Sequence, residues 1–338
     1  MFGDTVEEAM PEYQRAQGLK VHHSNLCSEI TLPTTEDRTA VCCLSSVNLE
    51  EFDEWRDDDM FIPDLVRMLD NVLTYFIENA PDELHRAKLS AQRERSIGLG
   101  AMGFHAYLQR QHIPFESVLA KGANNRMFNR IKSEAVRATK QLAVERGECP
   151  DGQGFGVRNA HLLAVAPNAS SSIICGNTSP SIEPYRANAF TQKTKSGSSL
   201  LKNEYLEDCL RDIDMDTDDV WKSIITNNGS VQHLEFLDDY TKDVFKTAVE
   251  IDQKWVIEFA ADRQKEICQS QSLNVFFPAN VSKQELHAIH MMAWKQGVKT
   301  LYYLRSEAIK RAETVSDEAL RKYIFDSIDE NACLACEG

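Results

Sequence analysis

Apolar residues recur at helical spacing in four stretches of the chain. Between Pro63 and Asn79 they lie three and four positions apart, as in an amphipathic helix, and Pro63 suits the first helical turn. The same pattern runs from Met127 to Arg146 and stops at Gly147, a residue that commonly ends helices. It returns in Asp239 to Gln264 and in Glu285 to Lys295. The sequence therefore predicts a chain in which helices dominate.

Short apolar runs lie between these helices. Residues 41–49, residues 161–166 before Pro167, and residues 299–303 each have the length of a buried strand. Helices that alternate with short buried strands are typical of the α/β class, with the helices outside a strand core. The sequence shows no internal repeat and no low-complexity segment.

The composition is that of a globular protein. The chain has 338 residues, 42% of them hydrophobic, which is enough for one large core or two ordinary ones. The net charge of −15 disfavours polymeric nucleic acid as a partner, because such binding depends on Lys and Arg at the phosphates. The sequence contains no run of 18 or more apolar residues, so it predicts no membrane span. The first eight residues lack the pattern of a secretory signal. We therefore expect a cytoplasmic protein.

Nine cysteines, an odd number at irregular spacing, do not form the pattern of a disulfide framework. We expect Cys149, Cys175, Cys209 and Cys268 to be reduced, buried thiols. The other five belong to motifs that require separate interpretation.

Gly98 to Gly103 fits the dinucleotide fingerprint G-x-G-x-x-G. Its context does not fit, because the preceding residues do not read as a strand and no strand-ending acidic residue follows about 20 positions later. We interpret these glycines as allowing close packing of a helix against its neighbours.

Cys27 and Glu29 lie two positions apart, and Asn25 lies two positions before Cys27. On an extended segment the three side chains would share one face, so that a thiol and a carboxylate could act in one pocket. A buried cysteine beside a surface glutamate gives the same spacing. Spacing alone favours that structural explanation.

Three further motifs require interpretation. The small residues of Pro167 to Ser172 suit either a phosphate-binding loop, whose backbone N–H groups hold an anion, or an ordinary turn with a serine N-cap. Tyr302 and Tyr303, taken alone, suit a strand with one ring inward and one outward. Cys333-x-x-Cys336 could be half a zinc site, but the last forty residues contain no histidine and no other cysteine. A redox pair on a mobile acidic tail fits those two cysteines better.

Four sequence blocks resemble class I ribonucleotide reductase large subunits, in the family's order and over essentially the whole chain. The blocks are the finger loop Ser24 to Ile30, the cysteine strand Ala40 to Ser45, the substrate phosphate loop Pro167 to Ser172 with Asn177 to Pro184 behind it, and the radical-relay strand Gly297 to Tyr303. Their common order makes a chance similarity implausible.

The resemblance implies a role for each residue of the first two blocks. Cys27 would carry the thiyl radical that removes the 3′ hydrogen of the substrate, and Glu29 would accept the 3′-hydroxyl proton. Asn25 would orient this pair. Cys42 would be one of two cysteines that supply electrons when the 2′-hydroxyl leaves as water. Cys43 should then point to the opposite face and be structural.

The remaining blocks would bind the substrate and carry the radical. The substrate contacts implied are Ser24, Pro167, Asn168, Ala169, Ser170 and Ser171. Tyr303 would receive a radical from a small subunit with a dimetal-tyrosyl centre, and Tyr302 would deliver it to Cys27. Cys333 and Cys336 would reduce the active-site disulfide and would in turn be reduced by thioredoxin or glutaredoxin. No metal or cofactor is expected on this chain, and the relay type indicates ribonucleoside diphosphates as substrates.

The resemblance also implies the carboxy-terminal half of a ten-stranded α/β barrel, with the finger loop inside, helices outside and about five strands from this chain. Residues 1–315 would form this barrel part and residues 316–338 a flexible redox-active tail. The family's second reducing cysteine and its nucleotide-sensing domains lie upstream of the finger loop, so we expect a separate amino-terminal chain to supply them. The alternatives are a non-catalytic assembly or regulatory fragment that binds the small subunit and, on the terminal cysteines alone, a zinc-binding interaction module.

Overall fold

The computed structural model describes residues 1–194 and 197–306. The predicted boundary at residue 316, the tail and its two cysteines, Cys333 and Cys336, lie outside these residues.

The first part of the chain contains α1 (Gly3–Glu8), α2 (Glu12–Ala16), β1 (Leu44–Asn48), α3 (Phe52–Trp55), α4 (Phe61–Asn79), α5 (His85–Glu94), β2 (Gly98–Met102), α6 (Phe104–Arg110) and α7 (Val118–Arg146). Short 3₁₀ turns lie at Leu49–Glu51, Asp82–Leu84 and Pro150–Gly152. The second part contains α8 (Ala169–Ile174), β3 (Ala189–Thr194), β4 (Gly197–Lys202), α9 (Glu204–Asp212), α10 (Asp218–Thr226), α11 (Asp239–Val244), α12 (Gln253–Gln264), β5 (Val275–Phe277), α13 (Lys283–Lys295) and β6 (Leu304–Ser306).

Five extended segments run parallel in one continuous order. β1 pairs with β2, and β2 pairs in turn with residues 161–165 through a bridge between Leu99 and Leu163. A bridge from Val165 to Gln271 adds residues 269–275, and β5 then pairs with β6. Five parallel segments agree with the number of barrel strands that the resemblance implied.

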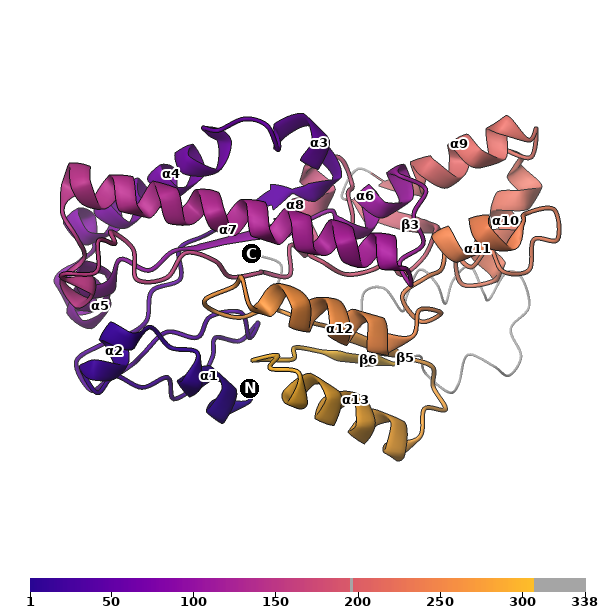
Figure 1. Cartoon of the computed structure of the whole chain (residues 1–338). Coiled ribbons are helices and arrows are strands. Elements are labelled where there is room, and N and C mark those ends of the chain that lie inside the picture. The colour runs from indigo at the N-terminus through magenta and orange to yellow at the C-terminus, as the bar shows by residue number, and fades with distance from the viewer. Residues whose placement is uncertain (195–196, 307–338) are drawn as a thin grey trace.

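Helices cover this sheet on the outside. In Figure 1 the long helix α7 lies between α4 and α12, and α13 lies on the other side of α12. One large hydrophobic core fills the space between these helices and the strands. A second, smaller core is formed by α9, α10 and α11 with the start of β3, which Figure 1 shows at the opposite end from α5.

Three of the four predicted helices form at or close to the expected positions, as α4, α7 and α13, although α7 begins nine residues before Met127. The single helix predicted over residues 239–264 is wrong, because residues 245–252 separate α11 from α12. A new cap begins the second helix, since the Asp252 side chain accepts a hydrogen bond from the Lys254 N–H at 2.9 Å.

The predicted strands are shorter than expected. Residues 41–49 contain only β1, in which Val47 alone is buried, and residues 161–166 pair through isolated bridges. Residues 299–303 are not a regular strand, and β6 follows them instead.

Gly98 and Gly100 lie within β2 itself, so the expected packing of a helix at these glycines is wrong. A Cβ atom on Gly100 would lie 2.4 Å from the Ala164 carbonyl oxygen, and one on Gly98 would lie 2.3 Å from Leu44 Cδ2. The glycines therefore allow the neighbouring extended segments to approach β2. A dinucleotide site would need them in the turn after a strand.

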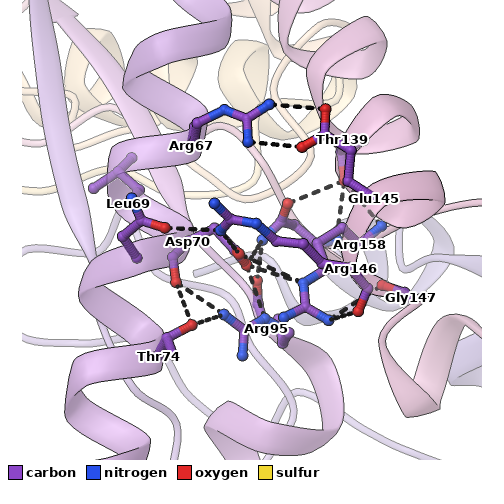
Figure 2. A network of polar contacts seen from close by, with 12 residues as sticks. Arg67, Leu69, Asp70, Thr74, Arg95, Thr139, Glu145, Arg146, Gly147 and Arg158 are labelled. Carbon is purple, nitrogen blue, oxygen red and sulfur yellow. Dashed lines mark hydrogen bonds and ion pairs between the residues drawn. The ribbon is translucent and has the colours of Figure 1, made fainter.

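Asp70, fully buried on α4, connects several elements to this sheet (Figure 2). Its carboxylate accepts hydrogen bonds from Arg95 Nε at 2.8 Å, from Arg146 at 2.8 Å and from Asn159 Nδ2 at 3.2 Å. Arg158 Nε lies 3.3 Å from Asp70 Oδ1. These partners come from the end of α5, from α7 and from the segment that leads into residues 161–165, so one carboxylate fixes the helices to the sheet.

Candidate active site

The finger loop is a tight turn, not an extended segment. It turns at Leu26 and Cys27, and Ser28 has a left-handed backbone (φ 71°). Asn25 closes the turn, because its carbonyl oxygen accepts the Ser28 N–H at 3.1 Å and its side-chain Oδ1 accepts the Ile30 N–H at 3.0 Å. Residues 25, 27 and 29 therefore do not share a face through strand geometry, as was predicted, because the segment is a turn.

Ser272 joins the two central residues of the loop. Its hydroxyl lies 2.5 Å from the Cys27 carbonyl oxygen and 2.9 Å from Glu29 Oε2, within hydrogen-bond reach of both. Glu29 is only 3% exposed, and its carbonyl oxygen accepts the Ser270 N–H at 2.9 Å. The Glu29 carboxylate is therefore held inside the protein on the same serine that positions Cys27, and a buried cysteine beside a surface glutamate does not describe this loop.

Ser272 was missed by the sequence analysis. It belongs to Gln269 to Ser272, four consecutive polar residues that are all buried, shortly before the buried strand β5. Four consecutive polar residues leading into a buried strand are unusual, because buried polar groups need partners. That run was the available signal.

Cys42 lies close to this pair. The residue is exposed at the pocket, but the surrounding protein atoms partly desolvate its thiol and raise the pKa to about 12, and the negative charges of Glu29, Cys43 and Cys27 add to the shift. Cys42 therefore holds its proton at neutral pH. Cys43 is buried on the other side, where its sulfur donates to the Leu69 carbonyl oxygen at 3.6 Å. The expected opposite orientation of the two cysteines is confirmed.

An open pocket of about 400 Å³ connects the finger loop to Cys42. Its wall includes Ser24, Asn25 and Cys42 together with Thr35, Arg38 and Thr39. Three of the predicted site residues therefore border one cavity.

The predicted phosphate loop is bonded to β1, which begins two residues after Cys42. Asn168 has a left-handed backbone (φ 52°), and its side-chain amide exchanges hydrogen bonds with Ser46 Oγ of β1 at 3.0 and 3.2 Å. α8 begins at the next residue, Ala169, which is exposed together with Ser171. The turn has no serine N-cap, because the N-cap position is Asn168 and its side chain makes no capping hydrogen bond.

Tyr302 and Tyr303 stack on each other, with ring centroids 3.8 Å apart at 34°. A regular strand would send adjacent rings to opposite faces, so the expected inward and outward arrangement is wrong. The Tyr302 N–H donates to the Leu273 carbonyl oxygen at 2.8 Å, and Leu273 follows Ser272 directly. Consecutive residues of one segment thus contact the tyrosine pair and Cys27.

Asn274 links the backbone of Tyr303 to the buried Glu183. Neither Asn274 nor Glu183 received a role in the sequence analysis. The Asn274 amide donates to Glu183 at 2.5 Å, and its oxygen accepts the Tyr303 N–H at 2.9 Å. Burial raises the pKa of Glu183 to about 7 against the opposing charges of Arg186 and Arg305. The Arg305 guanidinium also lies over the Tyr303 ring, 4.9 Å from its centroid.

Other sequence expectations concern single features. Cys149 is buried and Cys209 and Cys268 are partly buried, but Cys175 is exposed, which contradicts the expectation for that residue. Within residues 1–194 and 197–306, no group of three or more His, Cys, Asp or Glu side chains is arranged to hold a metal ion. None of the helices in these residues is both long and apolar enough to cross a membrane.

Comparison with known proteins agrees with this geometry. The family described as "Ribonucleotide reductase, barrel domain" matches residues 1–154 and 150–304. The ribonucleoside-diphosphate reductase large subunit of Invertebrate iridescent virus 6 is 52% identical over 310 residues, which are 90% of this chain and 32% of that protein. The corresponding subunit of Invertebrate iridescent virus 3 is 47% identical over 338 residues, 99% of this chain and 53% of that protein.

A solved structure has the same fold. The class Id ribonucleotide reductase alpha subunit of Actinobacillus ureae superimposes with a TM-score of 0.85 at 40% identity, over 90% of this chain and 57% of that chain. The chain thus spans between a third and somewhat over half of the length of the proteins it matches. With a family match over nearly all described residues and this structural agreement, the chain belongs to the ribonucleotide reductase barrel-domain family.

Proposed function

We propose that the chain is the catalytic component of a ribonucleotide reductase that converts ribonucleoside diphosphates to 2′-deoxyribonucleotides. A separate amino-terminal chain would complete its active site. The observation that carries the proposal is that the Ser272 hydroxyl lies within hydrogen-bond distance of both the Cys27 carbonyl oxygen and the Glu29 carboxylate. The Cys42 thiol lies close enough to Cys27 and Glu29 for their negative charges to raise its pKa.

The proposed reaction uses these three residues in sequence. A thiyl radical on Cys27 removes the 3′ hydrogen atom, and Glu29 accepts the 3′-hydroxyl proton. The 2′-hydroxyl leaves as water after taking a proton from Cys42. Cys42 and a cysteine of the amino-terminal chain give up two electrons and become a disulfide, while the hydrogen of the second thiol passes to C2′ and Glu29 returns its proton to the 3′ oxygen. Cys27 finally returns the hydrogen atom to the 3′ position and regains its radical.

Substrate binding is proposed for the finger loop and for the α8 loop, whose Asn168 is bonded to Ser46 of β1. Asn25 Oδ1 is committed to the Ile30 N–H, so the amide nitrogen is the group available to orient the sugar. Ser24 lines the same pocket. The diphosphate would lie on the α8 loop, whose proposed contacts are Pro167, Asn168, Ala169, Ser170 and Ser171.

The radical and the electrons would come from other proteins. We propose that a small subunit with a dimetal-tyrosyl centre supplies the radical to Tyr303, and that Tyr302 passes it to Cys27. The ring contact within the pair supports direct transfer between the two tyrosines. Cys333 and Cys336 would exchange with the active-site disulfide, and thioredoxin or glutaredoxin would reduce them.

Reconstitution tests this function. The chain is purified together with a candidate amino-terminal chain and the small subunit, and deoxynucleotide formation is measured with a dithiol reductant. Turnover should be lost in Cys27→Ser and retained in the matched control Cys209→Ser, which lies in the second core. Assembly without turnover in every pairing would show instead a non-catalytic fragment that binds the small subunit.

A further inference from the structure

Glu183 is a buried carboxylate to which the proposed reaction gives no role. It lies between α8 and β3 and is 5% exposed. The side-chain amide of Asn274, itself 3% exposed, donates to Glu183 Oε1 at 2.5 Å. A carboxylate is costly to bury and is held by such partners. The hydrogen bond to Asn274 connects this carboxylate to the tyrosine pair.

Asn274 holds the backbone of Tyr303. Its Oδ1 accepts the Tyr303 N–H at 2.9 Å, and the next residue, Val275, donates its N–H to the Tyr303 carbonyl oxygen at 3.0 Å. The amide group of Asn274 has a donor end and an acceptor end. A carboxylate oxygen on one side accepts and a backbone N–H on the other side donates, so both neighbours require the same orientation of this amide. Glu183 therefore fixes the group that receives the Tyr303 N–H.

The segment that carries Asn274 also holds the finger loop. The Ser272 hydroxyl contacts that loop, the Leu273 carbonyl oxygen accepts the Tyr302 N–H at 2.8 Å, and Asn274 binds Tyr303. Three consecutive residues thus set the position of both tyrosines relative to the finger loop. A shift of Asn274 would change that spacing.

Glu183 also affects the charge beside the Tyr303 ring. The Arg305 guanidinium lies over this ring, 4.9 Å from its centroid, where a cation is attracted to the ring face. Arg186 and Arg305 are both close enough to Glu183 for their charges to oppose the rise that burial causes in its pKa. The negative charge of Glu183 therefore offsets part of the positive charge that Arg305 brings to the ring.

We propose that Glu183 is a positioning residue for Tyr303, acting through Asn274 on the tyrosine backbone and together with Arg305 on the charge beside its ring. The inference rests on the proposed function, since the tyrosine pair serves as a radical relay only there. It adds to that function a carboxylate that keeps the Tyr303 ring against Tyr302, at the centroid distance of 3.8 Å, and that sets how readily its phenol ionises.

A spectroscopic probe at position 303 tests the effect of charge. In the full chain Tyr303 is replaced by 3-nitrotyrosine, whose phenolate absorbs visible light, and its pKa is read from an absorbance titration. A unit charge within several ångströms shifts such a pKa by about one unit at an effective dielectric constant near 20. Arg305→Gln removes a cation and should raise the pKa of the probe by about one unit. Glu183→Gln removes the opposing charge and should lower it by about half a unit.

Circular dichroism of the nitro band tests the effect on position, because the band arises from a ring held in a fixed asymmetric contact. Glu183→Gln retains an acceptor for Asn274 and should keep the band. Glu183→Leu removes that acceptor and should weaken the band. Arg67→Gln and Glu145→Gln, at an exposed ion pair between α4 and α7, are the matched controls and should change neither the band nor the titration.

Two results overturn the proposal. Titration curves that coincide with and without Glu183→Gln would show that its charge does not reach the ring. An unchanged nitro band in folded Glu183→Leu would show that Asn274 holds Tyr303 without it. If Glu183→Leu does not fold, Asn274→Leu cuts the same connection at its other end and gives the same comparison.

These measurements need neither turnover nor the small subunit, so they are independent of the test of the proposed function. A chain that gives the expected shifts but no deoxynucleotide in any reconstitution would refute the proposed function alone. An active reconstituted enzyme whose probe shows no shift in Glu183→Gln would refute only the role of Glu183.

Discussion

At the scale of single residues, Ser272 is the side chain on which the proposed chemistry depends most. A hydrogen bond to a buried charged group contributes about 1.5–3 kcal/mol, so Ser272→Ala should lower reconstituted turnover by about 10- to 100-fold. The measurement is the initial rate of deoxynucleotide formation.

Ser270→Ala is the matched control for this variant. Ser270 is equally buried, but its hydroxyl pairs with Thr300 instead of Glu29. Both variants should lose thermal stability, and only Ser272→Ala should lose turnover. Equal loss of turnover in both would mean that the serine acts through the fold.

Glu183 should make stability depend on pH in an unusual direction for a carboxyl group. Its folded pKa of about 7 lies above the unfolded value of 4.5, so its contribution is full below pH 4.5 and is lost as pH rises through about 7. Glu183→Gln keeps an acceptor for Asn274 and removes the titration.

Urea unfolding at pH 5, 6 and 8 measures this effect. The wild type should lose up to about 3 kcal/mol relative to Glu183→Gln across this range. Parallel stability profiles for the two proteins would contradict the assignment.

At the scale of elements, the Asp70 network should be the most sensitive polar contact in the fold (Figure 2). Asp70→Asn leaves the guanidinium groups of Arg95, Arg146 and Arg158 without their shared carboxylate. Breaking a buried ion pair in this way costs about 3–5 kcal/mol. The exposed pair of Arg67 and Glu145 provides the control, and Glu145→Gln should leave the melting temperature nearly unchanged.

The stability loss of Asp70→Asn should also depend on pH. Hydrogen bonds and charges of Arg95, Arg158 and Arg146 overcome burial and hold the pKa of Asp70 below its ordinary value. Its contribution is therefore present above the unfolded pKa, near about 4, and is lost as pH falls through the lower folded pKa. The deficit of Asp70→Asn, measured by thermal unfolding, should shrink below pH 4. A constant deficit would show that the charge is not responsible.

Helices were predicted well where one apolar face meets the core. α4 and α13 follow their periodicity because each presents a single stripe to the strands or to a neighbouring helix. The break between α11 and α12 was missed because apolar spacing continues across it. Its signal was local: the Thr247 N–H and hydroxyl both bond to Glu250, and Asp252 caps the next helix.

The motifs singled out residues that the structure brings close together, but the local geometry expected for them was wrong. Cys27, Glu29 and Cys42 were identified from motifs, but the left-handed Ser28 and the stacked tyrosines contradict the strand geometry assumed for them. The polar run 269–272 marked Ser272 as unusual, but its contact with the finger loop could not be predicted, because contacts between distant segments follow from tertiary packing.

At the scale of the whole molecule, the five-segment sheet has two outer edges. Within the described residues, no strand pairs with the outer side of β1 or of β6. Unpaired edges promote association with another strand. The chain alone should therefore associate or precipitate as its concentration rises, and an amino-terminal chain that completes the barrel should raise its solubility and melting temperature. Light scattering after size exclusion and calorimetry measure both, and an isolated chain that is monomeric, soluble and cooperatively folded would contradict this.

The contact between Ser272 and the finger loop also has a consequence for folding kinetics. It joins residues that are 243 and 245 positions apart, so the loop and the segment that holds it meet only after a very long chain closure. Contacts of such high sequence separation generally form late. A ribosome must therefore have released the segment around residue 272 before the finger loop can be fixed in place, and Cys27 gains its final geometry among the last steps of folding.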